Sequence, residues 1–202
     1  NVDLGTGDDT LQITVGSSTP DAPGSGGGIL IDVTGGAGSD TIGVQIGDPN
    51  AATVTRAYNP AAATVCVSGD AGSDAVSLTI AARFAAGEVF SADIFTGDGD
   101  DVVNVNSLAA LGDGSVRLAV DTGDGADKFE LDAAGLANSP VGYTIKLRLN
   151  TGAGSDSARL SFFDVFTDVS ADLGAGNDSL YMKYGDVKGE SFLKIDGGEG
   201  ND

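Results

Sequence analysis

Glycine and aspartate recur together in this chain as a Gly-x-Gly-x-Asp turn or a close variant, eight times in 202 residues. Aspartate supplies a hard anionic oxygen, and glycine permits backbone conformations that turn carbonyl oxygens inward. Ca²⁺ prefers oxygen ligands of both kinds. The predicted ligands are the first, third and fifth residues of each copy: Gly5, Gly7, Asp9; Gly36, Gly38, Asp40; Asp70, Gly72, Asp74; Gly97, Gly99, Asp101; Gly123, Gly125, Asp127; Gly152, Gly154, Asp156; Gly174, Gly176, Asp178; and Gly198, Gly200, Asp202.

A second acidic residue lies six positions before the final aspartate in four of the copies. These residues are Asp3, Asp121, Asp172 and Asp196, and Asn150 is a neutral variant at the same position. They are either additional metal ligands or groups that cap the turn. The sequence leaves both interpretations open.

The segments that flank each turn alternate between apolar and polar side chains. The final aspartates are 31, 34, 27, 26, 29, 22 and 24 residues apart. Apolar residues occupy the second, fourth and sixth positions after the aspartate, as at Ile42, Val44 and Ile46, and the seventh and ninth positions before it, as at Val67 and Val65. Such alternation is typical of a strand with one face in a core. Each turn is therefore predicted to join two strands.

A repeated strand-turn-strand unit with connectors of variable length predicts an all-β fold, a parallel β-solenoid (β-roll or β-helix) of about seven coils. Residues 1–202 would form one continuous domain, with the turns stacked along one edge roughly 4.8 Å apart. About seven Ca²⁺ ions, one in each gap between turns, would form a ladder along that edge. Whether the coil is a flat two-sheet roll or a triangle stays open, and a third short strand is possible near Thr53–Thr55.

An antiparallel sandwich with hairpin turns is the alternative fold. Hairpins require neither a glycine two residues before the aspartate in every copy nor turns on only one of the two edges. The repeat therefore favours the solenoid.

Charge and composition exclude several classes of protein. The chain has 30 acidic and 10 basic residues, a net charge of −20 and no histidine. A strongly acidic surface argues against nucleic-acid binding, and no apolar run approaches the length of a membrane span. Only Cys66 is present, so a bound metal would take the stabilising role that disulfides have in many secreted domains. Acidic residues kept for solubility would be the simpler explanation, but solubility does not explain their concentration beside glycines.

The turns resemble the nonapeptide of the repeats-in-toxin (RTX) calcium-binding family, Gly-Gly-x-Gly-x-Asp-x-aliphatic-x. Residues Gly35–Gly43 fit the whole pattern, and Gly197–Asp202 fit its first six positions. The resemblance implies a secreted parallel β-roll with Ca²⁺ between successive turns. The chain departs from the family in having one such turn per coil instead of two, so a single row of ions is expected.

Catalysis is not expected. The absence of histidine removes His-based triads and the common zinc sites, and the glycine-rich turns end in aspartate instead of opening a helix. Some enzymes that act on polysaccharides combine a β-helix with Ca²⁺ and a basic residue. Lys146, Arg148 and Arg159 are the nearest approach to a basic cluster, which keeps a Ca²⁺-dependent polysaccharide-acting enzyme as an alternative.

The leading interpretation is an extracellular Ca²⁺-binding structural protein, a module of a fibre, a surface layer or an adhesin. Neither end of the sequence carries a capping segment, so the expected partners are neighbouring repeats of a longer chain or copies stacked head to tail. Surface glycans are possible partners. The alternative from the family resemblance is a secretion or folding region of a larger secreted enzyme or toxin.

Overall fold

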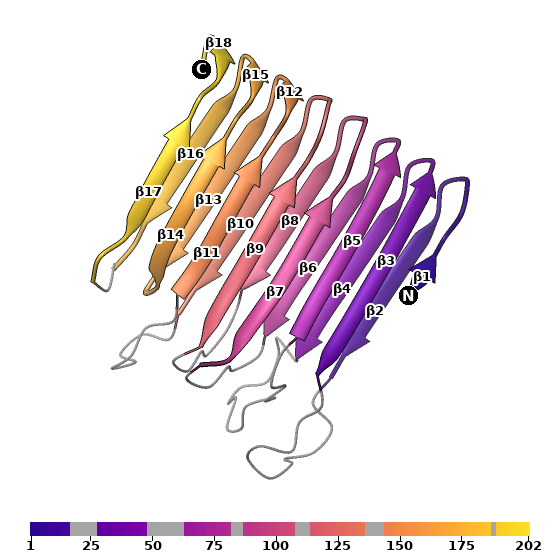
Figure 1. The fold of residues 1–202 in the computed structure, drawn as a ribbon, viewed down its shortest axis with the longest axis horizontal. Helices are drawn as coiled ribbons and strands as arrows, with labels where there is room; N and C mark the ends of the chain where they lie inside the picture. The colour runs from indigo at the N-terminus through magenta and orange to yellow at the C-terminus, as the bar shows by residue number, and fades with distance from the viewer. Residues whose placement is uncertain (17–27, 48–62, 82–86, 108–113, 136–143, 187–188) are drawn as a thin grey trace.

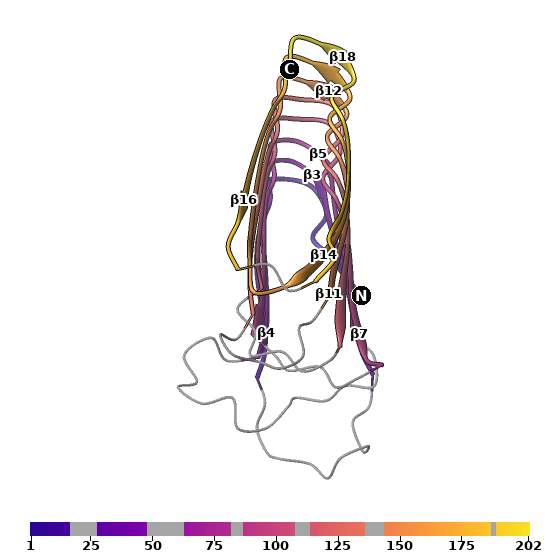
Figure 2. The ribbon, with the colours of Figure 1, turned by 90° about the vertical axis from the view of Figure 1, so that its left-hand side faces the viewer.

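The computed structural model describes residues 1–16, 28–47, 63–81, 87–107, 114–135, 144–186 and 189–202. Strands are the only regular elements in these ranges, and they lie in two facing parallel sheets joined by the glycine-aspartate turns along one edge (Figures 1 and 2). The predicted parallel β-solenoid is therefore confirmed. Across the same residues, we find no helix of sufficient length and hydrophobicity to span a membrane.

The strands that precede the turns form an eight-stranded sheet in which every neighbour is parallel. In spatial order they are β1 (Val2–Asp3), β3 (Ile29–Ala37), β5 (Ala63–Ala71), β7 (Val89–Phe95), β9 (Ser115–Asp121), β11 (Thr144–Asn150), β14 (Phe166–Asp172) and β17 (Phe192–Asp196).

The strands that follow the turns form a seven-stranded sheet, also wholly parallel. Its members are β2 (Thr10–Val15), β4 (Thr41–Gly47), β6 (Ala75–Ala81), β8 (Val102–Ser107), β10 (Lys128–Ala134), β13 (Ser157–Phe163) and β16 (Ser179–Tyr184). Parallel pairing throughout both sheets excludes the antiparallel sandwich.

The register places equivalent residues of successive coils on one another. Val44 pairs with Leu78, Leu78 with Val105, and Val105 with Leu131. The inward-facing side chains of both sheets form one hydrophobic cluster. Inner strands such as β9 and β11 bury alternate residues, as the sequence predicted, whereas every residue of the terminal strand β17 is exposed. Thr167, which breaks the apolar pattern, is nevertheless buried at its core position.

A third, narrow ladder runs along the turn edge itself. It consists of β12 (Ala153–Gly154), β15 (Ala175–Gly176) and β18 (Glu199–Gly200), and isolated parallel bridges extend it through the earlier turns. The end-on view shows two long walls closed by this short edge (Figure 2). The third strand considered near Thr53–Thr55 lies outside the described residues.

Candidate metal site at the turn edge

Glycines set the backbone of each turn. Gly36 and Gly38 have φ angles of 99° and 137°, in the region that favours glycine. Asp70 replaces the first glycine in the third copy and keeps the same conformation, with φ 79°. The Ser68 hydroxyl donates to Asp70 Oδ1 at 2.7 Å. Aspartate tolerates this region better than most residues, so the third turn keeps its shape.

Stacking imposes a second requirement for glycine. A β-carbon on Gly38 would overlap the carbonyl oxygen of Gly7 in the preceding coil, and one on Gly99 would overlap that of Gly72. Several carbonyls of the turns are also engaged between coils, since Ala37 O accepts the Gly7 N–H at 2.7 Å. The predicted ligand set included turn carbonyls. Of the predicted carbonyls, Gly5 O accepts the Ala37 N–H at 3.2 Å and Gly152 O accepts the Ala175 N–H at 2.8 Å, so part of this set already has hydrogen-bond partners.

The final aspartates form a continuous row, the aspartate row, that runs along the inner side of the turn edge. The backbone N–H of each aspartate donates to Oδ1 of the aspartate in the next coil, at N···O distances of 2.7–3.2 Å. The donor and acceptor pairs are Asp9–Asp40, Asp40–Asp74, Asp74–Asp101, Asp101–Asp127, Asp127–Asp156, Asp156–Asp178 and Asp178–Asp202. At the turn, Oδ1 thus accepts the inter-coil hydrogen bond that a backbone carbonyl accepts in the adjoining strands.

The second carboxylate oxygen of the same residues is left without a partner. The Oδ2 atoms are buried and have no hydrogen bond within the described residues at seven positions: Asp9, Asp40, Asp74, Asp101, Asp127, Asp156 and Asp178. An asparagine would make the same Oδ1 hydrogen bond without burying a charge, yet all eight turns carry aspartate. Burial of an unpaired carboxylate is costly, so these oxygens favour either a proton or a counter-charge.

Threonine hydroxyls adjoin part of the row, a feature that the sequence analysis missed. Thr96, Thr122 and Thr151 lie five residues before Asp101, Asp127 and Asp156, and each is within hydrogen-bonding reach of that carboxylate. Each hydroxyl donates its proton to a carbonyl of the next coil, those of Thr122, Thr151 and Leu173, at 3.0, 3.3 and 2.8 Å. The sequence did contain a signal for these contacts, because threonine recurs five residues before the final aspartate in three consecutive copies.

Burial raises the pKa of four carboxyl groups in the row, those of Asp74, Asp101, Asp127 and Asp156. For Asp127 it raises the pKa to about 6, against the lowering effect of the Asp101 N–H. The neighbouring carboxyl groups of Asp101 and Asp156 raise it further. The folded row therefore favours either protons or a bound cation over bare negative charge.

In buffer freed of divalent cations, lowering the pH from 7.5 to 5.5 is expected to raise the melting temperature. Unfolded aspartates titrate near pH 3.9, whereas the folded pKa of Asp127 is about 6. The folded state therefore binds more protons, and this stabilisation is complete below about pH 4 and is lost as the pH rises through about 6. Thermal unfolding followed by circular dichroism measures it. The variant Asp127→Asn should show a smaller shift, and equal melting temperatures for the parent chain would contradict the expectation.

Two of the second acids, Asp172 and Asp196, cap their turns. Asp172 Oδ1 accepts the Gly174 N–H and Asp196 Oδ1 accepts the Gly198 N–H, both at 3.2 Å. At the same position in earlier coils, Asn150 Nδ2 donates to Asp121 Oδ1 at 3.1 Å. These contacts favour turn capping over metal binding for Asp172 and Asp196.

Each coil contributes one inner carboxylate to the row. Within the described ranges, no three His, Cys, Asp or Glu side chains gather closely enough to hold a metal ion by themselves. A cation on the row would therefore combine carboxylate oxygens with backbone carbonyls and water, which Ca²⁺ readily accepts. The chemistry of the donor set fits a hard cation.

The residues considered as a basic cluster do not form one. Lys146 and Arg148 are exposed on β11 of the eight-stranded sheet, whereas Arg159 is exposed on β13 of the seven-stranded sheet. The two sheets face each other across the core, so these side chains lie on opposite outer surfaces. Lys146 lies 3.5 Å from Asp168, which partly neutralises it.

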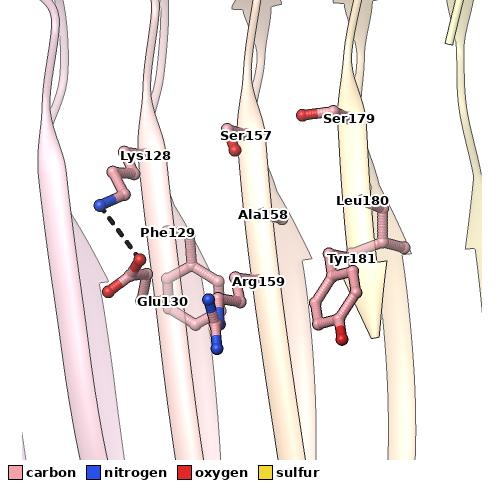
Figure 3. A pocket seen from close by; sticks show the side chains of 9 residues that line it. All are labelled: Lys128, Phe129, Glu130, Ser157, Ala158, Arg159, Ser179, Leu180 and Tyr181. Carbon is pink, nitrogen blue, oxygen red and sulfur yellow. Dashed lines mark ion pairs between the residues drawn. The ribbon is translucent and has the colours of Figure 1, made fainter. Parts of the chain in front are cut away.

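A shallow groove of about 360 Å³ crosses the outer face of β10, β13 and β16 (Figure 3). The Arg159 guanidinium lies 5.5 Å from the centre of the Tyr181 ring. Glu130 pairs in register with Arg159 but forms its ion pair with Lys128, at 3.0 Å. The groove therefore holds a cation-aromatic pair beside an ion pair.

Comparisons with known proteins returned no family model, no curated protein and no solved structure that matches this chain.

Proposed function

We propose that this chain is an extracellular structural solenoid whose aspartate row binds Ca²⁺. Its role would be that of a rigid module in a fibre, a surface layer or an adhesin, in contact with neighbouring repeats or further copies. The observation that carries the proposal is the row of seven buried Oδ2 atoms for which the described part of the chain supplies no hydrogen-bond partner. The Oδ1 atoms already meet the structural need of the turns, so the second oxygen and its charge call for another explanation.

Electrostatics supports a divalent cation as that explanation. Carboxylates stacked about 4.8 Å apart repel each other by about 3 kcal/mol per neighbouring pair at an effective dielectric of 20. The net charge of −20 adds a general repulsion that opposes a compact state. Ca²⁺ would neutralise two charges per ion and bridge adjacent coils. It would thus stabilise the contacts between successive coils, which carry the load when a structural protein is pulled along the stack.

Thermal unfolding with and without Ca²⁺ tests this function. At pH 7.5, millimolar CaCl₂ is expected to raise the melting temperature strongly over EGTA, because a ligand that binds only the folded state stabilises it. Millimolar MgCl₂ is the control and should act much less, since Mg²⁺ retains its water and demands octahedral geometry. Equal melting temperatures in CaCl₂ and EGTA would refute the proposal.

A further inference from the structure

The residue five positions before each final aspartate, here termed the gate position, differs among the coils. It is glycine at Gly35, Gly69 and Gly197, threonine at Thr96, Thr122 and Thr151, and leucine at Leu4 and Leu173. At Gly35 and Gly69 this residue lies directly against the unpartnered Oδ2 of Asp40 and Asp74, and at Thr96, Thr122 and Thr151 it lies within hydrogen-bonding reach of the carboxylate of its own turn. Its side chain therefore decides what can reach that oxygen.

In the threonine coils, a neutral hydroxyl occupies the space between the two coils. Thr122 lies within hydrogen-bonding reach of the Asp127 carboxylate, and its hydroxyl donates to Thr151 O of the next coil at 3.3 Å. The hydroxyl uses its one proton on that carbonyl and occupies the space between the carbonyl and the Asp127 carboxylate. A cation cannot take the same place without displacing that hydroxyl.

In the glycine coils, the same two kinds of oxygen meet without a side chain between them. A β-carbon on Gly69 would overlap Asp74 Oδ2 and would lie 2.7 Å from Thr96 O of the next coil. A β-carbon on Gly35 would likewise overlap Asp40 Oδ2 and would lie 3.1 Å from the next carbonyl, Gly69 O. An anionic oxygen and a carbonyl oxygen of adjacent coils thus converge beside each glycine.

We infer that the gate position selects where Ca²⁺ binds. The cation sites lie beside Gly35 and Gly69, where Asp40 with Gly69 O and Asp74 with Thr96 O provide the converging oxygens. Threonine at the gate position excludes the ion from the coils of Asp101, Asp127 and Asp156. This inference rests on the proposed function and replaces one ion in every gap with sites at the glycine coils of Asp40 and Asp74 and none at the three threonine coils.

Calorimetric titration of CaCl₂ into the full chain at pH 7.5 tests the inference through the number of ions bound. Thr122→Gly should bind one ion more than the parent chain, because it removes the side chain beside the Asp127 carboxylate. Gly35→Thr should bind one ion fewer, since it places a side chain beside Asp40. Thr122→Val is the matched control: it removes the hydroxyl but fills the space, and it should bind the same number of ions as the parent chain.

The outcomes separate this inference from the proposed function. A parent chain that binds no Ca²⁺ would overturn both. A parent chain that binds Ca²⁺ with the same stoichiometry as Thr122→Gly would overturn the gate alone. Circular dichroism checks that each variant is folded. If Gly35→Thr does not fold, the number of ions bound by Thr122→Gly, compared with the parent chain, is sufficient to test the inference.

Discussion

Gly38→Ala is expected to reduce the free energy of unfolding by roughly 3–5 kcal/mol. Two costs add in this variant. The φ angle of 137° is strained for any residue with a β-carbon, and the new methyl group overlaps the backbone carbonyl of Gly7. The clash is with backbone, so it cannot be relieved by rotating a side chain. Urea unfolding in CaCl₂ measures the loss.

Gly7→Ala is the matched control because it carries only one of these costs. Gly7 has a similar φ angle of 113°, but a β-carbon there would have nothing within 4 Å. Its expected loss is about 1–2 kcal/mol from backbone strain alone. Equal losses in the two variants would show that coil stacking does not require glycine at this position.

Two substitutions of Asp74 should separate the structural role of the row from its charge. Asp74→Ala removes the acceptor that the Asp40 N–H uses at 2.7 Å, and a buried unpaired N–H costs about 1–3 kcal/mol. That loss is expected in both EGTA and CaCl₂. Asp74→Asn keeps an Oδ1 acceptor and removes the charge, so in EGTA at pH 7.5 it should be at least as stable as the parent chain.

The asparagine variant should lose its advantage when Ca²⁺ is added. The parent chain gains stability from the ion, whereas Asp74→Asn lacks the anionic oxygen beside Gly69 and should gain less. Urea unfolding of the three proteins in both buffers gives the comparison. If Asp74→Asn gained as much from Ca²⁺ as the parent chain, the Asp74 carboxylate would not be a ligand.

Much of the fold follows from local pattern. Apolar residues at every second position, such as Ile42, Val44 and Ile46, predicted strands with one buried face. The repeated turn predicted a stack with its turns on one edge. Both predictions hold because the strand period and the turn geometry are properties of short segments. The narrow ladder along the turn edge was not predicted. It arises from the register between coils, which no single turn contains.

The chemistry of the turn was predicted less completely, for the same reason. The sequence identified Asp40 and Asp74 as candidate ligands, but it could not show that one oxygen of each serves the neighbouring coil's N–H. It also could not show that a residue such as Thr122 lies against a carboxylate. Lys146 and Arg159 illustrate the limit most clearly, because assignment to different sheets separates residues that lie close together in the sequence.

The most direct test of Ca²⁺ on the aspartate row is a crystal structure from crystals grown in CaCl₂, with anomalous diffraction measured at a wavelength where calcium scatters anomalously. The account predicts anomalous peaks beside Asp40 Oδ2 and Asp74 Oδ2, each bridging to the carbonyl of the next coil. A well-ordered row with no anomalous peak along it would contradict the account.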